Sequence, residues 1–264
     1  MGSGSGIRME LAVVGRGPVV RVRYLGLTAA LLALAAAACV APAGCEAEDP
    51  AAAPGPSGGV GPSTLLVRAN IVATGRVTNA ATPDDFDTTV SVRVERDGAV
   101  VPDAIVSLRR SDREAPDVLL PSEDDGRYVG DHVGYVPAYE LSVEAGPDTL
   151  DGVRIELPAV HAVTAPAPAA RVPAGNPLAV TWDALDAADR VTVSLGAAQT
   201  VLPDDPGTAE LPAAALAALV ADGAEVDRPL TVTREVRLAL EGGAAGSRAF
   251  AAVTNGLGAV TVVP

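Results

Sequence analysis

Aliphatic residues recur at every second position in many short runs between Thr64 and the end of the chain. In the run Val90–Val94, three valines alternate with Ser91 and Arg93, and the Asp97-Gly98 pair that follows is typical of a tight hairpin turn. Successive side chains of a β-strand point to opposite faces, so each run has one apolar and one polar face. The pattern predicts half-buried antiparallel strands, and the short turns between them are typical of β-sandwiches.

Further runs with this alternation follow along the chain: Ala104–Leu108, Tyr139–Val143, Val153–Leu157, Leu178–Trp182, Val191–Leu195, Leu230–Val232, Val236–Leu240 and Val260–Val262. A segment rich in Pro and Ala at 165–175 separates them into two sets. The sequence therefore predicts an all-β protein with two tandem antiparallel β-sandwich domains, at 64–165 and 166–264. The hinge is short enough for the two sandwiches to pack together.

One short helix is expected in the second domain. Pro212 suits a first helical position, the Ala-rich segment 213–221 favours a helix, and Gly223 can end it. The residues expected to face the core are Leu211, Ala215, Leu219 and Val220. We expect this helix to be a crossover between strands and not a binding element.

The first 38 residues have the pattern of a secretory signal peptide. Four arginines, at 8, 16, 21 and 23, precede the uncharged apolar stretch Leu25–Ala38, which ends in small residues. An uncleaved membrane helix is the alternative, because the uncharged run continues to Gly44 and approaches the ~20 residues needed to cross a bilayer. Pro42 and the Ala/Gly composition near the end of the run favour the signal peptide.

Both cysteines of the chain, Cys39 and Cys45, lie where the apolar stretch ends. Ala36-Ala37-Ala38-Cys39 resembles the lipobox of bacterial lipoproteins, as does Pro42-Ala43-Gly44-Cys45, and Cys39 is favoured of the two. The resemblance implies a diacylated cysteine as the new first residue. Two acyl chains suffice for stable membrane anchoring. A Cys39–Cys45 disulfide is the alternative in an exported protein.

Residues 39–63 are expected to form the lipid-attached flexible linker. The segment 46–63 is rich in Ala, Pro, Gly and Ser and buries too little apolar surface to offset its ordering entropy. Neither Val40 nor Glu46 is the Asp that marks inner-membrane retention in lipoproteins. The expected location is therefore the cell envelope, with the outer membrane preferred over the inner.

The charge of the chain argues against nucleic acid as a partner. All 19 basic residues are Arg, and without residues 1–38 the chain has 15 of them against 32 acidic residues, a net charge of −17. Nucleic-acid binding depends on basic residues that neutralise phosphates, so an acidic body of this kind repels the polymer. The acidity also keeps a small β protein soluble.

Parts of the two predicted sandwiches resemble known families. Asp103–Leu108, the turn Glu123–Tyr128 and the strand Tyr139–Val143 resemble carboxypeptidase-regulatory-like or transthyretin-like sandwiches. The resemblance implies that Gly126 adopts positive φ in the turn and that Tyr128 plugs the end of the sandwich.

In the second domain, Pro177–Trp182 and Asp189–Leu195 look like strands B and C of a fibronectin-III or immunoglobulin-like module. There Trp182 would be a core residue. Together these resemblances suggest a bacterial surface lipoprotein with a spacer, scaffold or binding role.

Catalytic residue patterns are weak. The two histidines are His132 and His161. A Ser122–His132–Asp131 set can be assembled on paper, but no strand–turn–helix elbow such as G-x-S-x-G surrounds any serine. No cysteine follows Cys45, which leaves no thiol for catalysis or metal binding in the predicted sandwiches. We expect no enzymatic activity and no cofactor.

Two binding functions stay open as alternatives. Acidic turn residues are weak calcium candidates because calcium takes several carboxylate oxygens; they are Asp84, Asp85, Asp87, Glu123, Asp124 and Asp125, with further clusters in 183–189 and at Asp204-Asp205. Tyr128, Tyr135 and Tyr139 could form an exposed aromatic platform for a glycan, but core or end-plug positions are favoured for these three.

The favoured hypothesis is a non-enzymatic cell-envelope lipoprotein that acts as a structural or protein-interaction module. The alternative is a calcium- or glycan-binding accessory module of a surface complex. Expected partners are the membrane, through the lipid anchor, and an envelope protein or glycan.

Overall fold

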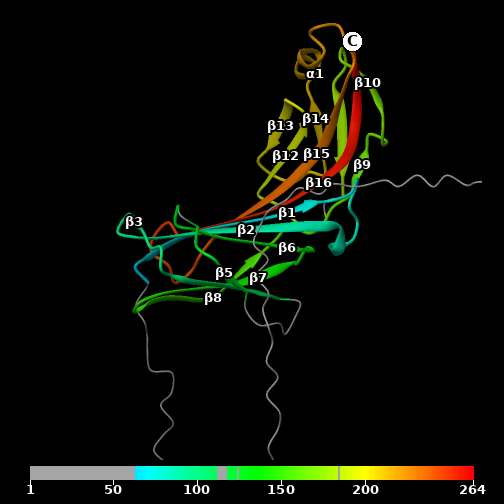
Figure 1. The fold of residues 1–264 in the computed structure, drawn as a ribbon. Helices are drawn as coiled ribbons and strands as arrows, with labels where there is room; N and C mark the ends of the chain where they lie inside the picture. Colours follow the sequence, from blue (N-terminus) through cyan, green and yellow to red (C-terminus); the bar gives the residue numbers. More distant parts are fainter. Residues whose placement is uncertain (1–62, 112–117, 124, 184) are drawn as a thin grey trace, which may run out of the picture. The chain divides into compact units, whose positions relative to one another are not determined.

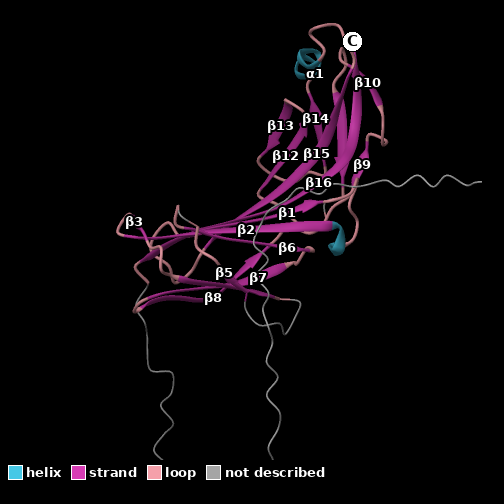
Figure 2. Cartoon of the chain, viewed as in Figure 1, coloured by secondary structure: helices cyan, strands magenta, loops and turns pink. Residues whose placement is uncertain are grey.

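The structure is a computed structural model that describes residues 63–111, 118–123, 125–183 and 185–264 (Figure 1). Strands dominate these residues, together with one 3-10 helix, Pro83–Asp85, and one α-helix (Figure 2). In chain order the elements are β1 (Leu65–Gly75), β2 (Phe86–Arg96), β3 (Ala99–Val100), β4 (Ile105–Arg110), β5 (Val118–Leu120), β6 (Arg127–Val133), β7 (Ala138–Ala145), β8 (Asp148–Glu156), β9 (Val163–Ala165), β10 (Arg171–Pro173), β11 (Leu178–Trp182), β12 (Arg190–Leu195), β13 (Ala198–Leu202), β14 (Thr208–Leu211), α1 (Ala213–Leu219), β15 (Val226–Ala239) and β16 (Arg248–Val263). The all-β fold class predicted from the sequence is confirmed.

The strands of the described residues form three sheets. The largest has the order β13-β12-β15-β16-β1-β2-β3, with β10 paired to β16 and β6 paired to β2. The others are β14-β11-β9 and β5-β4-β7-β8. Most pairs are antiparallel, as predicted, but β16 runs parallel to both β1 and β10. Parallel neighbours need a long connection, and nearly the whole described chain separates β1 from β16.

Two hydrophobic cores lie against this large sheet. The first core packs β1 and β2 against the four-stranded sheet, and its fully buried residues include Ile71, Val92, Leu141 and Ile155. The second core packs β12, β15 and β16 against the three-stranded sheet and α1; examples of its buried residues are Val180, Trp182, Val193, Leu216 and Val260. Each core is formed by the side chains between two facing sheets, as in a β-sandwich.

Strands β15 and β16 belong to both cores. Val232 and Val260 lie in the second core, whereas Ala251 and Val253 lie in the first. Figure 1 shows the two strands, orange and red, continuing from one set of sheets to the other. The predicted boundary at 165/166 thus does not separate the cores completely, because residues after 166 contribute to the first. Whether the ranges 64–165 and 166–264 fold independently stays a prediction.

A β-bulge changes which residues of β16 face inward within the part of the strand that borders the second core. From Ala249 to Leu257 the inward residues of β16 are odd-numbered. Near the end of the strand they are even-numbered, at Val260 and Val262. The pairing with β15 shifts between Leu230 and Thr231, which face Gly258 and Gly256. Gly258 has φ +83°, a conformation that favours glycine. The extra residue changes the alternation between Leu257 and Val260, both of which lie in the second core.

The locally coded features agree with the sequence predictions. Asp97 and Gly98 both have positive φ, as a tight hairpin turn between β2 and β3 requires. Gly126 has φ +74°, and Tyr128 is 1% exposed; its hydroxyl donates to the Val101 carbonyl at 2.7 Å and accepts from the Ala104 N–H at 2.8 Å. Gly126 thus has the positive φ that was expected, and Tyr128 is a buried residue of the first core.

The predicted helix is present but shorter. It spans Ala213–Leu219 with Pro212 at its N-cap, and Gly223 follows with φ +78°. Leu211 and Val220 are buried as expected, but the helix residue buried completely is Leu216, which the prediction had omitted. A helix of seven residues turns too few times for the inward positions to be placed from the pattern alone.

Candidate functional site

One arginine lies on the core-facing side of β15, at the place where the two cores meet. Val232, two residues before it, belongs to the second core, and Leu238, four residues after it, packs against the first. Between them Arg234 has 0% exposure and is the largest fully buried side chain among the described residues. A buried guanidinium must be paired and hydrogen-bonded to offset its lost hydration.

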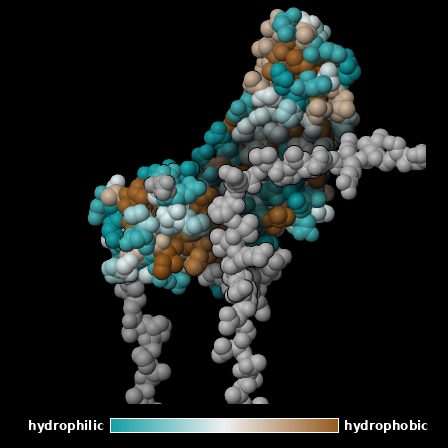
Figure 3. All heavy atoms as spheres, in the orientation of Figure 1, coloured by the Kyte–Doolittle hydropathy of each residue, from teal (hydrophilic) through white to brown (hydrophobic). Residues whose placement is uncertain are grey.

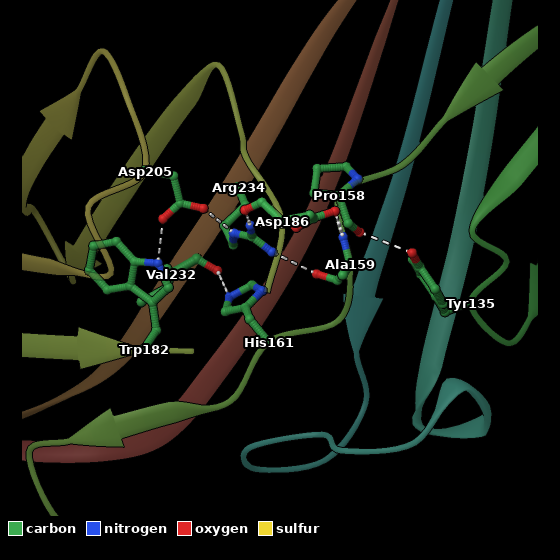
Figure 4. Close-up of polar contacts among 9 residues, drawn as sticks. All are labelled: Tyr135, Pro158, Ala159, His161, Trp182, Asp186, Asp205, Val232 and Arg234. Atoms are coloured by element: carbon green, nitrogen blue, oxygen red, sulfur yellow. Dashed lines mark hydrogen bonds and ion pairs between the residues drawn. The ribbon is translucent and has the colours of Figure 1, made fainter. Parts of the chain in front are cut away.

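The Arg234 guanidinium has a partner in each direction (Figure 4). Its Nε donates to Asp205 Oδ2 at 2.6 Å, Nη1 donates to the Ala159 carbonyl at 2.9 Å, and Nη2 donates to Asp186 Oδ1 at 2.6 Å and to the Asp186 carbonyl. These charge-assisted bonds are stronger than neutral ones. They connect β15 with the segment after β8 and with the loops on both sides of β12 and β13.

The two carboxylates are themselves held by other groups. Asp205 is 2% exposed in its side chain, and its Oδ1 accepts from the Trp182 indole N–H at 2.8 Å. Asp186 is partly exposed, and its Oδ2 accepts from the Ala159 N–H at 2.8 Å. Tyr135, in the first core, donates to the Pro158 carbonyl at 3.1 Å. Burial and the nearby Asp186 carboxylate raise the pKa of Tyr135 to about 12.

His161 lies beside this cluster and is 1% exposed. Its Nε2 is 3.1 Å from the Val232 carbonyl, which can only accept, so the neutral ring carries its proton on Nε2. Its Nδ1 has no hydrogen-bond partner among the described residues. Burial, followed by the positive charge of Arg234, lowers the pKa of His161 from 6.5 to about 4.

Asn255 makes a second polar connection between the cores. Its amide nitrogen donates to the carbonyls of Ala80 and His161, at 2.7 and 2.5 Å, and its amide oxygen accepts from the Ala80 N–H at 3.0 Å. Nearby, Asn79 makes two bonds to the backbone of Val163. We call Arg234, Asp186, Asp205, His161 and Asn255 the polar joint.

The polar joint connects segments and offers little reactive chemistry. The charge of Arg234 is matched by the carboxylates of Asp186 and Asp205. The His161 ring is buried against a carbonyl and keeps its neutral form over the ordinary pH range. Nucleophilic catalysis requires a base beside an accessible nucleophile, whereas the contacts described here join carboxylates, backbone carbonyls and an indole.

A second group of arginines gathers on the outward side of the large sheet. We call it the arginine face, and its members are Arg68, Arg93, Arg127, Arg190, Arg237 and Arg248. Arg248, Arg68, Arg93 and Arg127 lie directly opposite one another on β16, β1, β2 and β6. In Figure 3 hydrophilic residues cover much of the visible face, with smaller hydrophobic areas between them.

Two adjoining hollows open along the arginine face. The first, of about 380 Å³, is lined by Asp189, Arg190, Val201, Leu202, Pro203 and Arg237. The second, of about 330 Å³, is lined by Arg237, Arg248, Ala249 and Phe250. Arg237 borders both. Each hollow therefore combines guanidinium groups with an apolar wall.

The candidate catalytic set from the sequence is not assembled by hydrogen bonds between its members. Ser122 Oγ donates to the Glu123 carbonyl at 3.3 Å, and His132 Nε2 shares a hydrogen bond of 2.9 Å with the Tyr139 hydroxyl. His161 lies in the polar joint. The expectation of no enzymatic activity stays a prediction.

Four of the six candidate calcium ligands, Asp85, Asp87, Glu123 and Asp125, have protein partners for their carboxylates. Asp85 accepts from Thr82 N–H and hydroxyl, bonds that lower the pKa of its carboxyl. Asp87 pairs with Arg76, and both Glu123 and Asp125 pair with Arg127. The Asp84 carbonyl accepts from Arg76, and Asp124 lies outside the described residues. No group of three or more His, Cys, Asp or Glu side chains able to hold a metal ion is found in the described part of the chain.

The core positions favoured for the three tyrosines are confirmed, and the exposed aromatic platform, the alternative, is wrong. Tyr128, Tyr135 and Tyr139 are 1%, 8% and 0% exposed. All three belong to the first core: Tyr128 and Tyr139 lie on the inner sides of β6 and β7, and Tyr135 lies in the loop between these strands. Trp182 is likewise buried, at 4% exposure, as the sequence predicted.

The predicted leader and anchor lie outside the described residues. This applies to the signal peptide at 1–38, to Cys39 and Cys45, and to the linker 39–63 except for Ser63. Ser63 is buried and donates its N–H to the Gly242 carbonyl at 2.9 Å, so it belongs to the folded part. The one α-helix of the described residues is too short to cross a membrane.

Sequence reasoning missed the polar joint, although one signal was present. Inward positions of β15 alternate as Leu230, Val232, Arg234 and Val236, so a charged residue interrupts an apolar series. Such an interruption in a strand that otherwise faces a core indicates a buried charge with partners. Its carboxylate partners, Asp186 and Asp205, lie in the acidic clusters at 183–189 and 204–205, which the sequence offered as calcium candidates and which carry no local sign of a pairing with Arg234.

Comparisons with known proteins leave the family open. The chain matches no family model, and no curated protein matches it. Among solved structures it is similar to the fibronectin(III)-like modules of CbhA from Clostridium thermocellum, at 16% identity over 73% of this chain and 93% of that chain, with a TM-score of 0.24. A TM-score this low carries no argument, and the all-β architecture rests on the strands and cores described above.

Proposed function

We propose that the protein is a non-catalytic structural and interaction module of the cell envelope. In this proposal a diacylated Cys39 or Cys45 holds the chain at the membrane. The two fused β-sandwich cores form one stiff unit that presents a binding face. The compartment named in this proposal comes from the predicted leader and its two cysteines.

The observation that carries the proposal is the sharing of β15 and β16 by the two cores. A linker between separate modules is a few residues of extended chain and allows them to move. Here two paired strands of 14 and 16 residues run through both cores. Bending this ribbon between the cores would break ladder hydrogen bonds of both strands.

The polar joint supports the same proposal. Arg234 binds groups from three segments that are distant in sequence, and Asn255 joins Ala80 of the first half to His161. Any relative rotation of the cores would pull at least one of these buried groups from its partner. Leaving a buried polar group unsatisfied costs about 1–3 kcal/mol, and more if the group is charged. The joint therefore resists motion between the cores.

The stiffness of the connection between the two cores can be tested by pulsed electron spin resonance, which measures the distribution of distances between a spin label on each core. The full chain with Cys39→Ala and Cys45→Ala has no other thiol, so Thr149→Cys on β8 and Ala179→Cys on β11 can be labelled specifically. Both positions are exposed. We expect one narrow distance distribution, no wider than that of a reference pair within the second core, Ala179→Cys with Gln199→Cys. A distribution several times wider than the reference would show a hinge and contradict the proposal.

Mass spectrometry of the protein from its native host tests the anchor. We expect an amino-terminal cysteine that carries diacylglycerol, at position 39 or 45. Cys39→Ala together with Cys45→Ala should move the protein from the membrane to the soluble fraction, whereas a matched Ser→Ala change, such as Ser57→Ala, should leave it in the membrane. An intact, unmodified amino terminus would exclude the lipid anchor without affecting the stiffness of the folded part.

A further inference from the structure

The arginine face places like charges unusually close together. Neighbouring strands are about 4.8 Å apart, and Arg248, Arg68 and Arg93 follow one another directly across three of them. Like charges directly opposite one another destabilise a sheet. A row of this kind therefore needs anions, either from the chain or from a ligand.

The chain supplies anions to only part of the row. Glu95 lies between two of the arginines, 3.3 Å from Arg68 and 2.6 Å from Arg93. Arg127 is paired with Asp125 at 2.6 Å. The side chain of Arg248, which is exposed, makes no hydrogen bond or ion pair with any residue that the structure describes. The unmatched charge of the row is thus at Arg248, on the edge of the second hollow.

The neighbouring arginines are loosely matched. Arg237 and Arg190 are 3.7 and 3.9 Å from the same Glu235 oxygen, which is too far for hydrogen bonds. That oxygen and Arg190 Nε are both buried atoms without a hydrogen-bond partner among the described residues. Asp189 also lines the first hollow, but its carboxylate accepts the Arg237 backbone N–H at 2.7 Å. The guanidinium donors of Arg190, Arg237 and Arg248 consequently retain capacity for another anion.

The walls of the hollows indicate which chemical group of a ligand lies next to its anionic group. Phe250 is half-buried and lies beside Arg237 and Arg248, and Pro203 with Leu202 forms the apolar side next to Arg190. Two hollows that adjoin at Arg237 on one side of a sheet suit an extended ligand with repeated units. Each unit should present an apolar face to the wall and a carboxylate to a guanidinium, which binds carboxylates bidentately.

We propose that the arginine face binds a linear polysaccharide whose sugars carry carboxylates. The C–H face of each sugar ring lies against Phe250 or Pro203, and the carboxylates pair with Arg237, Arg248 and Arg190. This inference rests on the proposed function, because it names the ligand of the binding face in that proposal.

Isothermal titration of the full chain with sodium polygalacturonate tests the proposal. Fully methyl-esterified polygalacturonate is the control polymer, since it has the same backbone without the charge. Arg237→Gln with Arg248→Gln removes two charges from the face. The matched variant, Arg154→Gln with Arg171→Gln, removes two charges from exposed ion pairs on β8 and β10. Thermal melting checks that both variants fold.

We expect wild type to bind the charged polymer and not its ester, with affinity that falls as salt is raised. Arg237→Gln with Arg248→Gln should weaken binding about a hundredfold or more, because each of the two lost charge-assisted bonds contributes about tenfold or more. The Arg154/Arg171 variant should bind like wild type. Absence of binding, equal binding of the ester, equal weakening in both variants, or tighter binding of poly-L-glutamate would overturn the proposal. None of these results depends on the distance distribution between spin labels, so the two proposals can fail separately.

Discussion

Replacing Arg234 with methionine is expected to lower the free energy of unfolding by about 3–5 kcal/mol, the usual cost of removing one partner of a buried ion pair. Methionine fills a similar volume but leaves the Asp205 carboxylate buried, with the Trp182 indole N–H as its remaining partner of those described. It also leaves the Ala159 carbonyl without its donor. Chemical denaturation of the full chain, followed by circular dichroism, measures the change.

Two further variants show whether the loss comes from the charge. Arg234→Met with Asp205→Asn should recover part of the stability, because the neutral amide no longer has to be buried as an ion while its oxygen can still accept from Trp182. Arg154→Met, which breaks the exposed pair with Glu156, should cost less than about 1 kcal/mol. A change of less than about 1 kcal/mol for Arg234→Met itself would contradict the role given to the polar joint, because exposed pairs already account for that much.

Acid is expected to destabilise the protein through His161 by about 3 kcal/mol, since its pKa moves from 6.5 to about 4 and each unit is worth 1.36 kcal/mol. Burial is the main cause and the charge of Arg234 adds to it, while Asp205 and Asp183 act in the opposite direction. Between pH 6.5 and pH 4 the unfolded chain binds a proton that the folded chain refuses. The free energy of unfolding therefore falls as the pH drops through this window. The contribution of the neutral His161 to stability is fully present above pH 6.5.

Substitution of His161 isolates this contribution from that of the carboxyl groups. His161→Gln can still donate to the Val232 carbonyl but does not titrate, so the variant should lose stability less steeply than wild type between pH 7 and pH 4. Proton NMR provides a direct check because the chain has only two histidines. The imidazole signal that disappears in His161→Gln should not shift in wild type between pH 8 and pH 5. A midpoint near pH 6.5 for that signal would contradict the buried, neutral ring.

The strands were predictable because their signal is local. Val90–Val94 alternates with polar residues, and β2 places each of these valines in the first core. Asp97 and Gly98 tolerate positive φ, so the hairpin follows from two residues. The same reasoning placed Trp182 in the second core and α1 after Pro212, with its end misplaced by two residues.

The sharing of strands between the cores was not predictable from local patterns. Asn255-Gly256 is typical of a turn, and the sequence analysis took β16 as beginning near Val260; instead β16 runs unbroken from Arg248 to Val263. The Asn255 side chain bonds to Ala80 and His161, and those partners compensate for a residue of low strand propensity. Its conformation was decided by groups about 175 and 94 positions away.

The candidate functional residues divide in the same way. The tyrosines at 128, 135 and 139 were open to two readings, and only packing against the opposite sheet decided that they are buried. The arginine face was not predicted at all, because Arg248, Arg68 and Arg93 are far apart in the chain and meet only through strand pairing.

The sequence by itself determined that this chain forms strands, where most of them lie and which of their sides are apolar, because the two-residue period of a strand is a property of neighbouring residues. Only the tertiary structure decided which strands pair, and therefore that β15 and β16 serve two cores, that Arg234 is buried between them and that arginines gather on the outer side. These outcomes depend on contacts between residues far apart in the chain, whose energies no local pattern contains.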